Sequence, residues 1–145
     1  MRCLGLDLGS KTLGLALSDA TNCIASVYTT LRFLDEDYNS LIAPLREIIL
    51  KENVGTLVLG LPKNMNNTLG ERAMITLEFK KLLEDNFNIP VVMEDERATI
   101  AKEASEFISN NILISADMSR NKRKKKVDGI AAEIILQGYL DKIKR

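Results

Sequence analysis

Three short apolar segments open the chain and do most to limit the folds it can adopt. Residues 2–8, 14–18 and 24–30 have the length and composition of β-strands, and turn-forming residues separate them. This arrangement predicts an antiparallel meander of three strands.

After Ser40 the pattern changes to helices alternating with strands. Apolar residues at helical spacing predict a helix that ends at Glu52, and Asn53-Val54-Gly55 terminates it. The continuous apolar run 56–61 predicts a strand buried on both faces. The remaining pattern predicts a helix from Glu71 to before Asn88, a strand over 91–94, and helices over 99–110 and 127–142.

This order of elements predicts an α/β fold with a mixed five-stranded sheet. Right-handed crossovers would put the fourth and fifth strands parallel to the first, beyond its free side. The first strand would then be central, with helices on both faces of the sheet. The chain has 145 residues, no internal repeat and no linker, so we expect one domain over residues 1–145.

The composition excludes several kinds of chemistry and of location. The chain has no histidine, which removes Ser-His-Asp triads, zinc-protease motifs and every histidine acid–base scheme. No apolar stretch approaches the ~18 residues of a membrane span, and no secretory leader is evident. We therefore expect a cytoplasmic protein without a membrane partner.

Acidic residues follow or interrupt apolar segments at three places. Asp7 lies near the end of the first strand, Asp95 and Glu96 lie just past the fifth, and Asp128 lies at the start of the last helix. The carboxyl ends of parallel strands meet at one edge of a sheet, where ligands tend to bind. Small residues beside Asp128 would let the last helix approach the same edge.

Clustered carboxylates repel one another unless they are protonated or bridged by a cation. Ligation by oxygen alone favours Mg²⁺ or Mn²⁺, and two such ions can catalyse phosphodiester cleavage. The structural alternative makes Asp7 an Asx-turn residue, Asp128 a residue favoured by the helix dipole and Glu96 a solvated loop residue. Spacing alone leaves both interpretations open.

Basic residues concentrate in one segment. Six of the seven residues in 120–126 are basic, so the rest of the chain carries a formal charge of −6. The segment is either an ordinary solvated one or a mobile cationic arm for a polyanionic substrate. Candidate nucleic-acid contacts are the basic residues of this segment and those expected at the same sheet edge: Lys11, Lys63, Arg72, Arg97, Arg123, Lys124 and Lys125.

Four ordered segments resemble the blocks of the YqgF/RuvX family over nearly the whole chain. They are DLGSKTLGLALSD (7–19), GLPKNMNNTLGERA (60–73), DERAT (95–99) and RKKKVDGIAAEIILQGYL (123–140). Asn67 stands where the family usually has Gly, and Ala98 and Ile100 also depart from the family pattern.

The resemblance implies an RNase H-like fold related to the RuvC resolvases and a Mg²⁺-dependent nuclease. The implied activity is processing of the 5′ end of pre-16S rRNA or, alternatively, Holliday-junction resolution. Matched position by position, the resemblance makes Asp7, Glu96 and Asp128 the catalytic and metal-binding acids. It leaves open whether Asp95 shares or takes over the role of Glu96.

Two further hypotheses remain beside the nuclease. A nucleic-acid-binding factor with little catalysis would use the basic segment and the loop within 60–72 as a docking surface, although the three acids argue against it. A sugar-kinase or actin-like ATPase would need a second DxG hairpin, and the chain has one. The apolar helix faces are expected to be used up in covering the sheet, which favours a monomer or weak homodimer and precursor rRNA over branched DNA.

Overall fold

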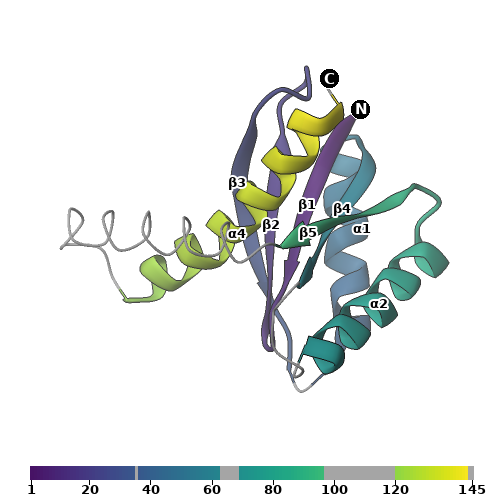
Figure 1. Ribbon diagram of the computed structural model, residues 1–145, viewed down its shortest axis with the longest axis vertical. Helices are drawn as coiled ribbons and strands as arrows, with labels where there is room; N and C mark the ends of the chain where they lie inside the picture. The colour runs from purple at the N-terminus through teal and green to yellow at the C-terminus, as the bar shows by residue number, and fades with distance from the viewer. Residues whose placement is uncertain (35, 63–68, 97–119, 144–145) are drawn as a thin grey trace.

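The computed structural model describes residues 1–34, 36–62, 69–96 and 120–143 (Figure 1). Its strands are β1 (Arg2–Leu8), β2 (Thr12–Ser18), β3 (Ala25–Arg32), β4 (Val54–Pro62) and β5 (Val91–Glu96). Its helices are the 3₁₀ helix η1 (Tyr38–Leu41) and the α-helices α1 (Ile42–Lys51), α2 (Leu69–Asn86) and α4 (Arg120–Ile143). No helix in these ranges is long and apolar enough to cross a membrane.

The five strands form one mixed sheet in the order β3-β2-β1-β4-β5. β2 pairs antiparallel with β1 and with β3, whereas β4 pairs parallel with β1 and with β5. The predicted meander, the two parallel crossover strands and the central position of the first strand are all confirmed.

Strand alternation divides the side chains of β1 between two cores. Leu4, Leu6 and Leu8 belong to a large core that includes residues of α1 and α2. Cys3 lies on the other face, in a smaller core with Ile135 and other residues of α4. Helices α1 and α2 thus cover one face of the sheet and α4 crosses the other, as Figure 1 shows.

Glycines allow α4 to lie close to the sheet. A Cβ atom on Gly5 of β1 would lie 2.7 Å from Leu136 Cβ and 3.0 Å from the carbonyl oxygen of Ala132. Gly60 of β4 lies against the end of the Ile135 side chain. The sequence predicted this close approach from small residues on the helix, but two of the glycines that permit it are in the sheet.

The predicted start of the last helix at Val127 is wrong. Helix α4 begins at Arg120, so the backbone of the basic segment 120–126 forms the first turns of the helix. The prediction that this segment precedes the helix is therefore wrong. Lysine and arginine are good helix formers, and no Gly or Pro precedes Gly129 in this helix. Asp128 is therefore well inside α4 and not at its start.

Some strand boundaries also differ from the prediction. β2 begins at Thr12, and β5 continues to Glu96, so Asp95 and Glu96 belong to the strand and do not follow it. The predicted helix over 99–110 lies outside the described residues.

Candidate active site

Asp7 occupies the next-to-last position of the central strand, at its carboxyl end. Its side chain is half-buried, and it alternates with Leu6 and Leu8, so it lies on the face that α4 crosses. Asp7 pairs with Gly14 of β2, and the register of β1 with β4 brings Gly60 beside it on the other side. Both strands that flank β1 therefore have a glycine in the position beside Asp7.

The β1–β2 hairpin carries Lys11 to the same end of the sheet as Asp7. The backbone N–H of Gly9 donates to the carbonyl oxygen of Thr12 at 2.7 Å, and the N–H of Phe33 donates to the carbonyl of Lys11 at 3.0 Å. These bonds hold the turn, and the Lys11 side chain is exposed.

Arg72 of α2 contacts the same strand end. Its guanidinium Nη2 donates a hydrogen bond of 2.7 Å to the carbonyl oxygen of Leu8, the residue after Asp7. The side chain is half-buried, and the hydroxyl of Thr76, one turn further on, donates to the carbonyl of Arg72 at 2.9 Å. The residue that was predicted to bind nucleic acid thus also ties α2 to the end of β1.

The last residues of β5 alternate between the two faces of the sheet. Val91 and Met93 pack into the core under α1 and α2, so the position of Asp95 lies on that face. Glu94 lies on the α4 face, where it contacts Lys142. Glu96 ends the strand and pairs in register with Pro62; its side chain lies outside the described part.

The helix residue that follows Asp128 is packed against the sheet. Gly129 is buried, and a Cβ atom there would meet the Val27 side chain of β3. Ala132, whose carbonyl faces Gly5, comes four residues after Asp128, about 6 Å along the helix axis. The backbone next to Asp128 thus lies over β3, whose Val27 is in register with Ala16 of β2 and, through it, with Gly5 of β1.

Within the described residues, no three acidic or cysteine side chains lie close enough together to hold a metal ion. This does not test the predicted carboxylate cluster, because the side chains of Glu96 and Asp128 lie outside the described part. Lys63 and Arg97 lie outside it altogether, as do the side chains of Arg123, Lys124 and Lys125.

The sequence-based prediction missed one buried carboxylate on the same face. Glu94 is 6% exposed, and its Oε1 accepts a hydrogen bond of 2.6 Å from Lys142 Nζ. A charged residue inside the apolar run of the fifth strand was the available signal. Burial also raises the pKa of the half-buried Glu133 carboxyl of α4, because desolvation disfavours its ionised form.

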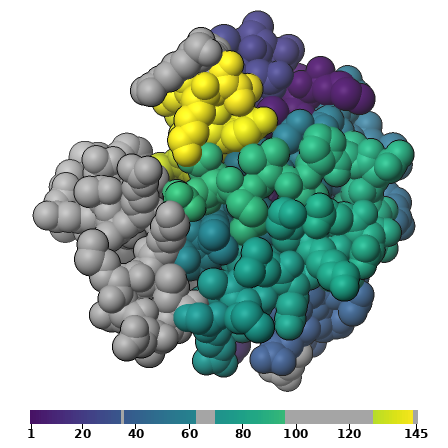
Figure 2. All heavy atoms as spheres, turned by 45° about the vertical axis from the view of Figure 1, so that its right-hand side comes forward, coloured from purple at the N-terminus to yellow at the C-terminus, as the bar shows by residue number. Residues whose placement is uncertain are grey.

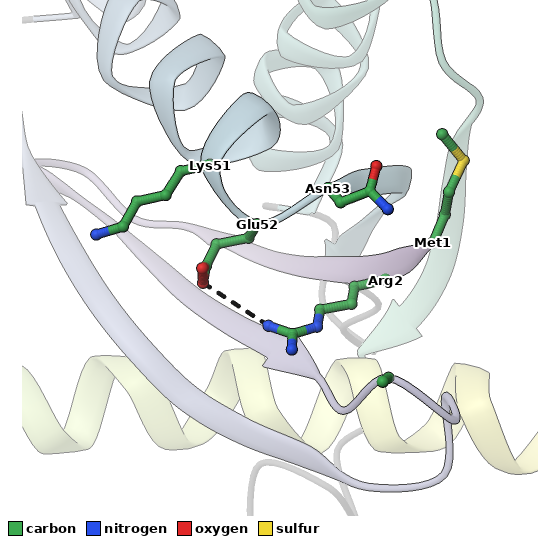
Figure 3. Close-up of a pocket in the computed structure, with 6 residues that line it drawn as sticks. Met1, Arg2, Lys51, Glu52 and Asn53 are labelled. Atoms are coloured by element: carbon green, nitrogen blue, oxygen red, sulfur yellow. Dashed lines mark ion pairs between the residues drawn. The ribbon is translucent and has the colours of Figure 1, made fainter.

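A pocket of about 350 Å³ lies at the opposite end of the sheet (Figure 3). It is lined by Met1, Arg2, Ala20, Lys51, Glu52 and Asn53. Arg2 and Glu52 form an ion pair of 3.8 Å beside it. Because the pocket adjoins the first residue of β1, it is separate from the carboxyl edge that carries Asp7.

The sheet order, with α4 across the face on which Asp7 lies, defines an RNase H-like fold of the resolvase type. The structure is similar to that of T. thermophilus RuvC in complex with a Holliday junction substrate, with a TM-score of 0.61 and 14% sequence identity. The similarity covers 99% of this chain and 96% of that one. The predicted fold is confirmed.

Residues 1–142 match the family described as RuvX, Holliday junction resolvase. A relative from Bacillus subtilis (strain 168) is 45% identical over 143 residues, which cover 99% of both chains. One from Staphylococcus aureus (strain JH9) is 49% identical over 142 residues, covering 97% of this chain and 95% of the relative. Both carry the provisional name pre-16S rRNA nuclease. The chain belongs to the RuvX family, as its four sequence blocks predicted.

Proposed function

We propose that this chain is a divalent-metal-dependent nuclease that hydrolyses phosphodiester bonds at the 5′ end of precursor 16S rRNA. The family match and the provisional name of the relatives support a nuclease. The structural observation that carries the proposal is the position of Asp7. It is half-buried at the carboxyl end of the central strand, on the face that α4 crosses.

We assign the catalytic acids as Asp7, Glu96 and Asp128. Glu96 comes two positions after Glu94, and strand alternation gives position 96 the same sheet face as Asp7. Position 95 belongs to the face of α1 and α2, so we assign the role to Glu96 and not to Asp95. β1 and β5 are two strand spacings apart, about 10 Å, a gap that two acidic side chains with bound ions can span.

The donor set of these acids fits Mg²⁺ or Mn²⁺. The chain contains no histidine, and carboxylates offer only hard oxygen ligands. Asp7, Glu96 and Asp128 would hold two such ions, which supply an activated water and charge stabilisation for the leaving oxygen. The chain's own contribution is to fix the acids on strand ends and on a helix packed against the sheet.

Basic residues around this edge would bind the nucleic-acid backbone. Lys11 is exposed at the tip of the hairpin beside Asp7. The first turn of α4 contains no acidic residue, and basic residues there are unfavourable to the helix dipole. A bound polyanion would relieve this cost, which supports nucleic-acid binding by the basic segment 120–126.

Precursor rRNA is our preferred substrate, because the relatives named above carry that assignment. Branched DNA is the second candidate, and the description of the family favours it. We propose that residues 1–145 act as a single domain in the cytoplasm, as a monomer or weak homodimer.

The test compares two aspartates on opposite faces of the same sheet edge. Purified Asp7→Asn and Asp95→Asn variants are assayed with Mg²⁺ or Mn²⁺ on precursor 16S rRNA fragments and on a four-way DNA junction. We expect Asp7→Asn to lose most of the cleavage and Asp95→Asn to keep it. Glu96→Gln and Asp128→Asn should behave like Asp7→Asn.

Each other outcome has a definite meaning. Full Mn²⁺-dependent cleavage by Asp7→Asn would refute the assignment of Asp7 to the catalytic centre. Loss of cleavage in Asp95→Asn alone would transfer the role from Glu96 to Asp95. Paired, symmetric nicks in the junction, with the rRNA uncut, would identify a resolvase. Binding without cleavage by the unmodified chain would identify a nucleic-acid-binding factor.

A further inference from the structure

An ion pair between a buried carboxylate and a largely exposed lysine joins β5 to the C-terminal part of α4. The Glu94 side chain is 7% exposed, and its Oε1 lies 2.6 Å from Lys142 Nζ. Glu94 is the only charged residue among the buried polar ones in the described part of the chain. Figure 2 shows the C-terminal part of α4 lying against β5 on the molecular surface.

Attaching a helix through a buried carboxylate has a cost in folding free energy. Burying a carboxylate carries a desolvation cost that an ion pair often does not recover, and apolar residues of similar size usually pack at least as stably. The surroundings on this face are apolar, with Val58, Leu136 and Leu140 in one core cluster. What the pair adds to such a core is a directional contact that fixes one geometry.

The position of α4 on β5 affects the distance between two of the assigned acids, Glu96 on β5 and Asp128 on α4. Glu94 precedes Glu96 by two residues on β5, and it is in register with Gly60, which lies beside Asp7. Lys142 follows Asp128 by fourteen residues, about 21 Å along one continuous helix. A rotation or slide of α4 at Lys142 would therefore be transmitted along the helix to Asp128.

A second contact restrains the opposite side of the same helix. Gln137 Oε1 accepts a hydrogen bond of 2.9 Å from the backbone N–H of Ala25, and its Nε2 donates to the carbonyl of Cys23 at 3.0 Å. The helix is thus held at β5 by the ion pair and at the start of β3 by the glutamine. Two such contacts on different sides define its rotation.

We propose that Glu94 and Lys142 are positioning residues, whose ion pair sets the position of α4 on β5 and thereby the spacing between Asp128 and Glu96. The inference rests on the proposed function, because it concerns the same metal-binding acids. Removing the pair should weaken metal binding more than it weakens the fold.

The experiment separates positioning from stability with three variants. Glu94→Gln and Lys142→Met each remove one charge, and the double variant Glu94→Met/Lys142→Met replaces the pair with apolar side chains. Mn²⁺ binding is measured directly by electron paramagnetic resonance, together with the Mn²⁺ dependence of cleavage and the Tm. Lys80→Met is the matched control, because it removes an exposed ion pair of 3.3 Å between Lys80 and Glu84 of α2.

We expect Mn²⁺ affinity to fall about tenfold in the two single variants, the size typical of residues that orient metal ligands. The double variant should regain the Tm of the unmodified chain and keep the weakened Mn²⁺ affinity. The Lys80→Met control should change neither quantity.

Recovery of Mn²⁺ affinity together with the Tm in the double variant would overturn the inference, since the pair would then act through stability alone. Unchanged Mn²⁺ affinity in all three variants would overturn it as well. A failure of the proposed function looks different, because the unmodified chain would then bind no Mn²⁺ and the inference would fall with it.

Discussion

Substitution of Gly5 by alanine tests how closely α4 packs on the central strand. The new Cβ would lie 2.7 Å from Leu136 Cβ and 3.0 Å from the carbonyl oxygen of Ala132. Both atoms are fixed to the helix backbone, so no side-chain rotation relieves the contact and the helix itself must move. Overpacking of this kind costs about 3 kcal/mol.

The loss of glycine also has a favourable effect. Alanine lowers the conformational entropy of the unfolded chain, which raises the free energy of unfolding by about 0.5–1 kcal/mol where the native backbone conformation suits alanine. The steric cost is larger, so we expect Gly5→Ala to lower the free energy of unfolding by about 2 kcal/mol. For a chain of this length that is a fall in Tm of about 6 °C. Urea unfolding and calorimetry measure the two quantities.

Gly60 provides the contrasting case. The atom that its new Cβ would meet is Ile135 Cδ1, the flexible end of a side chain, and Ile135→Val removes that atom. The double variant Gly60→Ala/Ile135→Val should therefore lose about 1 kcal/mol less than the sum of its two single variants. Leu136→Ala keeps the Cβ and should not rescue Gly5→Ala.

Gly70 is the control, because a Cβ there would have no atom of the described residues within 4 Å. Gly70→Ala lies in the first turn of α2 and should leave the free energy of unfolding unchanged or slightly raised. A Gly5→Ala chain as stable as the unmodified one would refute the packing argument. So would rescue of Gly5→Ala by Leu136→Ala.

Three further predictions concern other parts of the molecule. Hydrogen bonds from the Thr21 hydroxyl and from the backbone N–H groups of Ile24 and Cys23 lower the pKa of Asp19 from 3.8 to about 2. The stability that these bonds provide is therefore present above pH 4 and lost as the pH falls towards 2. Acid unfolding of Asp19→Asn should show a smaller dependence on pH in that range. Gln137→Met leaves two backbone groups next to β3 without their partner, and urea unfolding should show a loss of about 1–3 kcal/mol. The last prediction neutralises four basic residues of the segment 120–126, namely Lys122, Arg123, Lys124 and Lys125. The slope of the logarithm of the RNA-binding constant against the logarithm of the salt concentration should then fall by about 3 for single-stranded RNA. An unchanged slope would exclude the segment from the interface.

The amino-acid sequence by itself determined the order and pairing of the strands. Apolar runs of strand length, followed by apolar residues at helical spacing, are local patterns, and the handedness of crossovers then leaves few sheets to choose from. The position of Asp7 at the end of the central strand follows from the same argument. The four family blocks added the fold class and the nuclease, which the fold and family comparisons support.

Local patterns failed where charge and helix propensity conflicted. The basic residues of 120–126 were predicted to precede the last helix, because a charged run has no apolar period. The helix nevertheless begins at Arg120, since it is one continuous element with the apolar part that packs on the sheet. Tertiary packing of its later turns can stabilise a helix whose first turns have no apolar face.

Only the tertiary structure decided which groups meet across the sheet. Arg72 bonds to Leu8 across 64 residues of sequence, and Lys142 pairs with Glu94 across 48. The close approach of α4 depends on Gly5 and Gly60, and nothing in the sequence around these two strand glycines predicted that a helix packs on them. Such contacts depend on the register of neighbouring strands and on the height and rotation of a helix above them. No periodicity along the chain encodes these quantities, because they arise only when the separate elements pack.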